Sequence, residues 1–158
     1  YHVDEESLDT AAFAERLVRY AELYNITSIE DPFQENDPDS FRDLLHKLPH
    51  TIIVGDDLTT TNAERIQAAV HGKSISAVII KPNQVGTVTE TIQAIAMART
   101  AGIECIVSHR SGETNDAFIA DLAYAFGVHG IKVGAPRKPE RIAKIERLVA
   151  LSKMKPSI

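Results

Sequence analysis

The sequence lacks several features that define other classes of protein. It holds one cysteine, Cys105, inside an apolar run, which excludes a disulfide framework and predicts a small buried side chain. No apolar stretch approaches the roughly 18 residues of a membrane-spanning helix. The net charge is -5 without a block of like charges, so a nucleic-acid-binding surface is not indicated. These absences predict a cytoplasmic protein with no membrane span and no nucleic-acid partner.

The dipeptides that most strongly signal a two-residue hairpin turn are missing as well, because neither Asn-Gly nor Asp-Gly occurs in the sequence. Their absence argues against an antiparallel sheet. The composition, with 44% apolar and 25% charged residues, is that of an ordinary globular protein with enough apolar residues for one core. The sequence opens on Tyr1 and not on methionine, and we expect it to be part of a longer protein.

Five short apolar runs alternate with segments of helical periodicity. The runs are rich in β-branched residues, as buried parallel strands are, and each one ends in polar or charged side chains. These strand-end residues are Glu30, Asp56, Lys81, His109 and Lys132. They follow one another at steps of 26, 25, 28 and 23 residues, a nearly constant spacing. The sequence therefore predicts a repeated strand-helix unit.

Helix signals fill the gaps between the apolar runs. Asp37 precedes Pro38 as a cap precedes a first helical position, and Thr61-x-x-Glu64 and Thr87-x-x-Glu90 have the pattern of capping boxes. Further helices are expected over residues 116–126 and 139–153. An open doubly wound sheet would gather its ligand groups at one point, whereas here all five strand ends carry such groups.

We therefore predict an α/β fold, a partial TIM-type (β/α) barrel of about five parallel strands with intervening helices. A complete barrel needs eight strands and about 250 residues, so about three strands are expected outside this sequence.

Glu30 and Asp56 end neighbouring strands, and two carboxylates that point into one cleft repel each other unless a cation lies between them. Oxygen ligands favour magnesium (Mg2+), and no pair of cysteines or histidines at ligand spacing argues for zinc. Either carboxylate alone could simply cap the helix that follows it. The repeat favours a metal site because it places both residues on one rim. Asp57 is expected to cap a helix or to hold a neighbouring lysine.

Lys81 and Lys132 each end an apolar strand. A single lysine in such a place usually extends to solvent or pairs with a carboxylate. Placed in one cleft with Arg110, however, a lysine loses its proton more easily and becomes a candidate general base. Arg110 and Ser111 together suit phosphate oxygens, since a forked guanidinium lies beside a hydroxyl. His109 is either a substrate contact or a histidine held by a hydrogen bond at a strand end.

Five segments together resemble the signature segments of the enolase family, the phosphopyruvate hydratases: Ser28–Pro32, Gly55–Leu58, Lys81–Thr87, Ser108–Thr114 and Ile131–Pro136. The resemblance extends from about Phe13 to Leu151, in order and at matching spacings. It implies a magnesium-dependent lyase of glycolysis that interconverts 2-phosphoglycerate and phosphoenolpyruvate by removing a proton from carbon 2. It also implies that residues 1–158 are the C-terminal part of a modified barrel, with a smaller α+β domain and the first barrel strands upstream.

Roles for individual residues follow from the same resemblance. It implies that Glu30 and Asp56 are two of three carboxylates that hold magnesium, and that Lys81 is the catalytic base. It implies that four further residues bind the substrate: His109, Arg110, Ser111 and Lys132. The third carboxylate and the proton-donating glutamate would lie upstream of Tyr1, so we expect residues 1–158 alone to be inactive.

Two alternatives stay open at this stage. Another carbon-acid enzyme of the same superfamily, such as a racemase or cycloisomerase, would lack the Ser-His-Arg-Ser cluster that this sequence has. A non-catalytic binding protein could be built on a degenerate enolase barrel, and Val133 and Ile145-Glu146 depart from the family pattern. Because a partial barrel exposes strand edges, we also expect a homo-oligomer.

Overall fold

Five parallel strands form the central sheet of the computed structural model, which describes residues 1–154. Their order in the sheet is β3-β4-β5-β6-β7, so each strand pairs with its neighbours in the sequence. The strands are β3 (Ser28–Glu30), β4 (Ile52–Gly55), β5 (Ala77–Ile80), β6 (Glu104–Ser108) and β7 (Gly130–Lys132). All four pairings are parallel, which confirms the predicted α/β architecture of about five strands.

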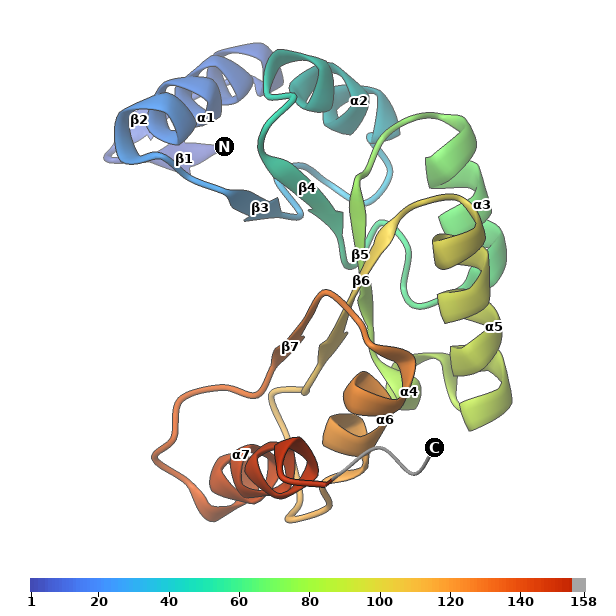
Figure 1. The fold of residues 1–158 in the computed structure, drawn as a ribbon. Coiled ribbons are helices and arrows are strands. Elements are labelled where there is room, and N and C mark those ends of the chain that lie inside the picture. The colour runs from blue at the N-terminus through green and yellow to red at the C-terminus, as the bar shows by residue number, and fades with distance from the viewer. Residues whose placement is uncertain (155–158) are drawn as a thin grey trace.

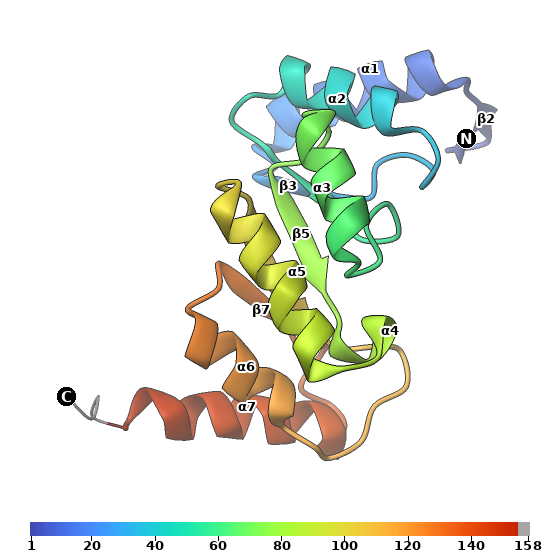
Figure 2. The same cartoon turned by 90° about the vertical axis from the view of Figure 1, so that its right-hand side faces the viewer.

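The sheet is curved, and the helices cover its convex side while the concave side is open (Figure 1). The helices are α1 (Thr10–Tyr24), α2 (Pro38–Lys47), α3 (Ala63–His71), α4 (Pro82–Val85), α5 (Val88–Thr100), α6 (Phe118–Phe126) and α7 (Pro139–Ser152). Figure 2 views the convex side and shows α3 and α5 side by side in front of β5. The arrangement is that of a barrel wall seen over part of its circumference.

Side chains alternate between the two faces of this sheet, as they must in extended strands. The concave face carries Val54, Ala77 and Ile79, which are buried against one another and against partly buried neighbours. The opposite face packs on the helices and forms the larger core, whose strand residues include Ile53, Val78, Ile80, Cys105 and Val107. Burial on both faces explains why the strands are continuous apolar runs in the sequence.

Two of the three helix caps predicted from the sequence are confirmed, and the third is wrong. Asp37 caps α2 at the Ser40 N–H, and Thr87 caps α5 at the Glu90 N–H. The capping box predicted at Thr61 is wrong, because Asn62 caps α3. The Asn62 side-chain oxygen accepts the backbone N–H groups of Glu64 and Arg65 at 2.9 and 3.0 Å. The Thr61 hydroxyl is buried and accepts the backbone N–H of Lys81 at 2.9 Å instead.

A small antiparallel hairpin precedes α1 and was not predicted. It pairs β1 (His2–Val3) with β2 (Glu6–Ser7). The turn residues Asp4 and Glu5 take φ values of 49° and 68°, the left-handed region that a two-residue hairpin turn requires. Tyr1 stacks on Phe13 of α1 with ring centroids 4.2 Å apart, so the hairpin is attached to the helical layer.

Candidate functional site

The charged residues that end the strands lie on the concave face, at the carboxyl ends of the sheet. Glu30 lies in register with Val54, whose side chain faces the concave side. Asp56 and Lys81 each follow an inward-facing residue by two positions and therefore face the same way. Lys132 lies in register with Ser108 on the neighbouring strand. The alternation along each strand thus brings four of the predicted site residues to one rim.

Asp56 and Lys81 form a tight ion pair on this rim. The Lys81 ammonium donates to the two carboxylate oxygens of Asp56 at 2.5 and 2.7 Å. Both side chains are largely buried, with exposed fractions of 13% for Lys81 and 12% for Asp56. Low exposure limits solvent screening of the pair, so each charge depends on the other. The predicted base and a predicted metal ligand are therefore direct partners.

Glu30 and Lys132 form the second pair, between the two outermost strands of the sheet. The Lys132 ammonium donates to both Glu30 oxygens, at 2.6 and 2.7 Å, across a separation of 102 residues. Each predicted metal ligand is thus neutralised by a lysine. Pairing with a carboxylate was one of the structural roles that the sequence left open for these lysines. The two ammonium groups relieve the repulsion between the carboxylates.

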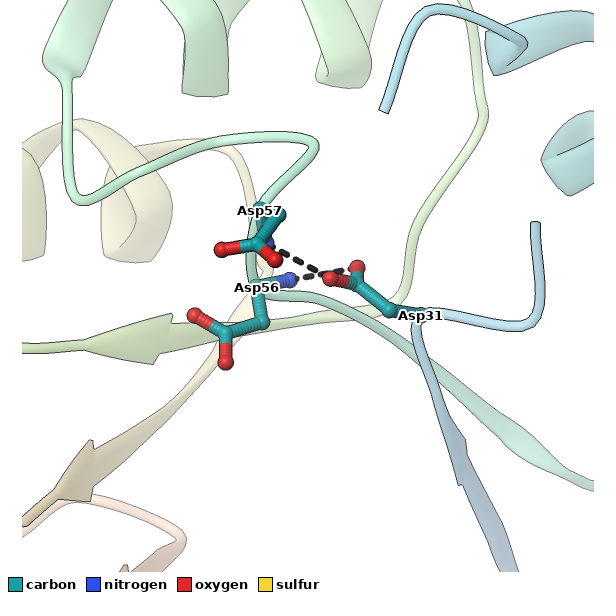
Figure 3. Close-up of side chains that lie close together, drawn as sticks. All are labelled: Asp31, Asp56 and Asp57. Atoms are coloured by element: carbon teal, nitrogen blue, oxygen red, sulfur yellow. Dashed lines mark hydrogen bonds between the residues drawn. The ribbon is translucent and has the colours of Figure 1, made fainter. Parts of the chain in front are cut away.

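Asp31 holds the turn that carries Asp56. Its two carboxylate oxygens accept the backbone N–H groups of Asp56 and Asp57, at 2.8 and 2.6 Å (Figure 3). One carboxylate oxygen from each of these three residues lies within 4.8 Å of the others. The pKa of Asp31 is raised above its usual value, with burial as the largest cause. The carboxylates of Asp56 and Asp57 raise it further, and the two backbone hydrogen bonds oppose the shift. Asp31 sits at φ 40°, in the left-handed region that Asp tolerates better than most residues. This role of Asp31 was not predicted from the sequence.

The donor set at this rim fits a hard divalent cation. Glu30 and Asp56 offer only carboxylate oxygens, from adjacent strands, and such ligands suit Mg2+. Asp31 is different, because both of its oxygens already accept backbone N–H groups. Figure 3 shows the Asp56 carboxylate directed away from Asp31. Both oxygens of Asp56, like both oxygens of Glu30, accept from a lysine ammonium.

The segment after β6 presents the predicted anion-binding groups. Its backbone continues the sheet by one hydrogen bond, from the His109 N–H to the Lys132 carbonyl at 3.0 Å. Within residues 1–154, neither the Arg110 guanidinium nor the Ser111 hydroxyl makes a hydrogen bond or ion pair, so both can bind an anion. The His109 Nδ1 lies beside both the Arg110 carbonyl and the Arg141 guanidinium. It donates to the carbonyl when it carries the proton and accepts from the guanidinium when it does not.

Cys105 is no part of this site. The thiol lies in the core between sheet and helices with 2% of its surface exposed, and burial raises its pKa to about 11. The prediction of a small buried side chain is confirmed. Among the described residues, no helix has the length and apolar character needed to cross a membrane.

Parallel strands in sequential order, helices on the convex face and charged side chains at the carboxyl ends of the strands define a (β/α) barrel protein of the TIM type. Residues 2–154 match the model of the enolase C-terminal TIM barrel domain. The chain therefore belongs to the enolase family.

Curated relatives agree with this assignment. The enolase of Sulfolobus acidocaldarius is 44% identical over 96% of this chain and 36% of its own length. The enolase of Elusimicrobium minutum is 49% identical over 84% of the chain and 31% of its own length. The enolase of Aeropyrum pernix is 45% identical over 96% of the chain and 35% of its own length. The chain thus spans about a third of the length of these relatives.

Proposed function

We propose that the protein to which these residues belong is a magnesium-dependent lyase that interconverts 2-phosphoglycerate and phosphoenolpyruvate in glycolysis. The observation that carries this proposal is the pairing on the concave rim, where Lys81 meets Asp56 and Lys132 meets Glu30 within a chain of the enolase family. We further propose a cytoplasmic location and a small-molecule substrate, in keeping with the curated relatives named enolase.

In this proposal Glu30 and Asp56 hold the metal, with a third carboxylate from outside these residues. When bound, Mg2+ supplies positive charge that stabilises the substrate carboxylate as negative charge develops on it. Lys132 faces the same carboxylate as a second cation. Arg110 and Ser111 bind the phosphate, because their side chains are the free donors beside the rim. His109 is placed at the edge of the substrate site.

Lys81 takes the proton from carbon 2. The electron pair of that C–H bond forms the new double bond to carbon 3, and hydroxide leaves carbon 3 with a proton from a donor outside these residues. Lys81 must be neutral before it can accept a proton, so its ion pair with Asp56 has to open first.

The test is Lys81→Ala in the full-length protein. We expect isotope exchange at carbon 2 of 2-phosphoglycerate to fall by a factor of about 10² to 10⁴, the usual contribution of a general base, while magnesium affinity stays within a few fold. Lys47→Ala is the matched control, since Lys47 forms an exposed ion pair with Glu15 far from the rim. Near-normal exchange in Lys81→Ala would place the base at another residue.

The rival hypothesis is a non-catalytic barrel in which the two ion pairs serve stability alone. It predicts that the wild-type full-length protein exchanges no proton at carbon 2 in the presence of magnesium. The same assay therefore separates the two functions.

A further inference from the structure

A lysine of α7 is almost completely buried and lies beneath the loop that follows β6. The Lys144 side chain is 1% exposed, and its ammonium is surrounded by four oxygens. It donates to the backbone carbonyls of Thr114, Asp116 and Glu140 at 3.0, 2.8 and 3.0 Å, and it pairs with the Glu113 carboxylate at 2.6 Å. Burying an ammonium costs several kcal/mol unless its donors are satisfied, so this arrangement fixes the loop carbonyls in place.

Glu113 connects the buried lysine to the predicted anion-binding residue. One oxygen of Glu113 meets Lys144, and the other accepts the backbone N–H of Arg110 at 2.8 Å. Burial alone would raise the pKa of Glu113. The hydrogen bonds from Lys144 and from the Arg110 N–H, with the charges of Lys144 and Arg141, outweigh burial and lower it. The group is therefore a carboxylate at neutral pH and accepts at both oxygens.

Arg141 lies one helical turn before Lys144 and holds the first part of the same loop. Its guanidinium donates to the carbonyls of Arg110 and Ser111 at 3.0 and 3.2 Å and contacts the His109 ring. A β-carbon at Gly134 would come within 3.1 Å of this guanidinium, so glycine leaves room for it. Arg141 thus binds the first half of the loop, and Lys144 binds the second half.

A cavity of about 410 Å³ borders the loop and leaves part of it without packing. Its lining includes Asn83 of α4, Gly112 and Glu113 of the loop, and Lys144 of α7. The side chains of Arg110 and Ser111 have no partner among residues 1–154, so they do not anchor their own backbone. The contacts with α7 therefore fix the positions of Arg110 and Ser111.

We propose that Lys144 is a positioning residue for the anion site: acting through Glu113 and the loop carbonyls, it holds Arg110 and Ser111 in the arrangement that receives the substrate phosphate. The inference rests on the proposed function, since that function supplies the anion. An ordered loop saves the conformational entropy that a mobile loop would lose on binding. A binding group that is misplaced by about 1 Å can lower the activity of an enzyme by a factor of about 10².

The experiment compares variants of the full-length protein. Lys144→Met keeps a long unbranched side chain but removes the ammonium, and Glu113→Gln makes the milder change of one carboxylate oxygen to an amide nitrogen. Arg147→Met is the matched control, because Arg147 lies on the same helix. Its partner is Asp121 of α6, whose side chain is 40% exposed, and the pair does not contact the loop. The readouts are KM and kcat for 2-phosphoglycerate, the dissociation constant of inorganic phosphate, and the dissociation constant of magnesium without substrate.

We expect Lys144→Met to raise KM and to weaken phosphate binding by about 10- to 100-fold, with kcat and magnesium affinity changed much less. Glu113→Gln should act in the same direction by a smaller factor, and it carries the test if Lys144→Met does not fold. Arg147→Met should leave all four values unchanged.

Two outcomes would overturn the inference in distinguishable ways. Lys144→Met and Glu113→Gln could both keep normal turnover and phosphate affinity, even with a lower melting temperature. That result would make Lys144 a purely structural residue and leave the proposed function intact. A wild-type protein that neither turns over 2-phosphoglycerate nor binds phosphate would overturn the inference and the proposed function together. Phosphate binding that weakens in the variants of an inactive protein would support the positioning role alone.

Discussion

At the scale of single residues, the Asp31 carboxylate positions a neighbouring carboxylate of the site through backbone hydrogen bonds. Both of its oxygens accept backbone N–H groups at the start of the turn after β4. That turn begins with Asp56, the partner of Lys81. The position of the Asp56 side chain on the rim therefore depends on Asp31, in the next turn along the sheet.

We expect Asp31→Ala to lower the free energy of unfolding by about 2 to 3 kcal/mol, because hydrogen bonds to a charged acceptor contribute about 1.5 to 3 kcal/mol. Asp31→Asn should cost about 1 kcal/mol, since its amide oxygen still accepts one N–H and asparagine tolerates the left-handed φ of 40°. Urea denaturation measures both values. Asp39→Ala, which breaks an exposed ion pair with Arg42, is the control. Equal losses for Asn and Ala at position 31 would show that the two N–H bonds do not set the stability here.

The strand-end residues were predictable because a repeat of about 25 residues and the alternation of side chains together fix which face each one occupies. Their pairing was not predictable. Whether Lys81 meets Asp56 or Glu30 depends on the stagger between strands, which the sequence does not encode in a local pattern. Lys144 was missed for a related reason, since a lysine within a helical apolar stripe usually extends to solvent.

At the scale of elements, the connection from β3 to α2 is held by an aromatic cluster. Phe33 lies in this connection, and its ring meets those of Tyr1, Phe13 and Phe41 edge-on with centroids 6.3, 6.1 and 5.8 Å apart. The cluster joins the N-terminal hairpin, α1 and α2 into one layer. It also fixes the chain two residues after Asp31.

Truncation of Phe33, which is 5% exposed, tests this cluster. We expect Phe33→Ala to lower the free energy of unfolding by about 3 to 5 kcal/mol, as for other large buried aromatic side chains. Tyr24→Ala should change it by less than about 0.5 kcal/mol, because Tyr24 is 67% exposed at the end of α1. Chemical denaturation with an unchanged m value gives both numbers. A loss below about 1 kcal/mol for Phe33→Ala would mean that the surrounding rings close over the cavity.

Elements with regular patterns were predicted well, and those that depend on unusual backbone angles were not. The five strands were visible as apolar β-branched runs. The hairpin of β1 and β2 was invisible because Asp4 and Glu5 adopt left-handed angles without a glycine or asparagine to signal the turn. The start of α3 shifted by one residue because Thr61 binds the Lys81 N–H and leaves capping to Asn62.

At the scale of the whole molecule, the described sheet has two outer strands, β3 and β7, each paired on one side within residues 1–154. Free edges offer backbone N–H and C=O groups to another chain. We expect the polypeptide of residues 1–158, prepared on its own, to form dimers or larger assemblies. Sedimentation over a range of concentrations measures this. A stable monomer at every concentration would show that the edges are blocked in another way.

The order of the strands has a consequence for how the molecule loses its structure. Within residues 1–154, each strand pairs only with its neighbours along the chain, so each end strand has one partner and each inner strand has two. Stability in such an arrangement builds up toward the middle of the series and fades toward its ends. The ion pair of Glu30 and Lys132 connects β3 with β7. The two strands with the fewest partners are therefore linked to each other by a salt bridge.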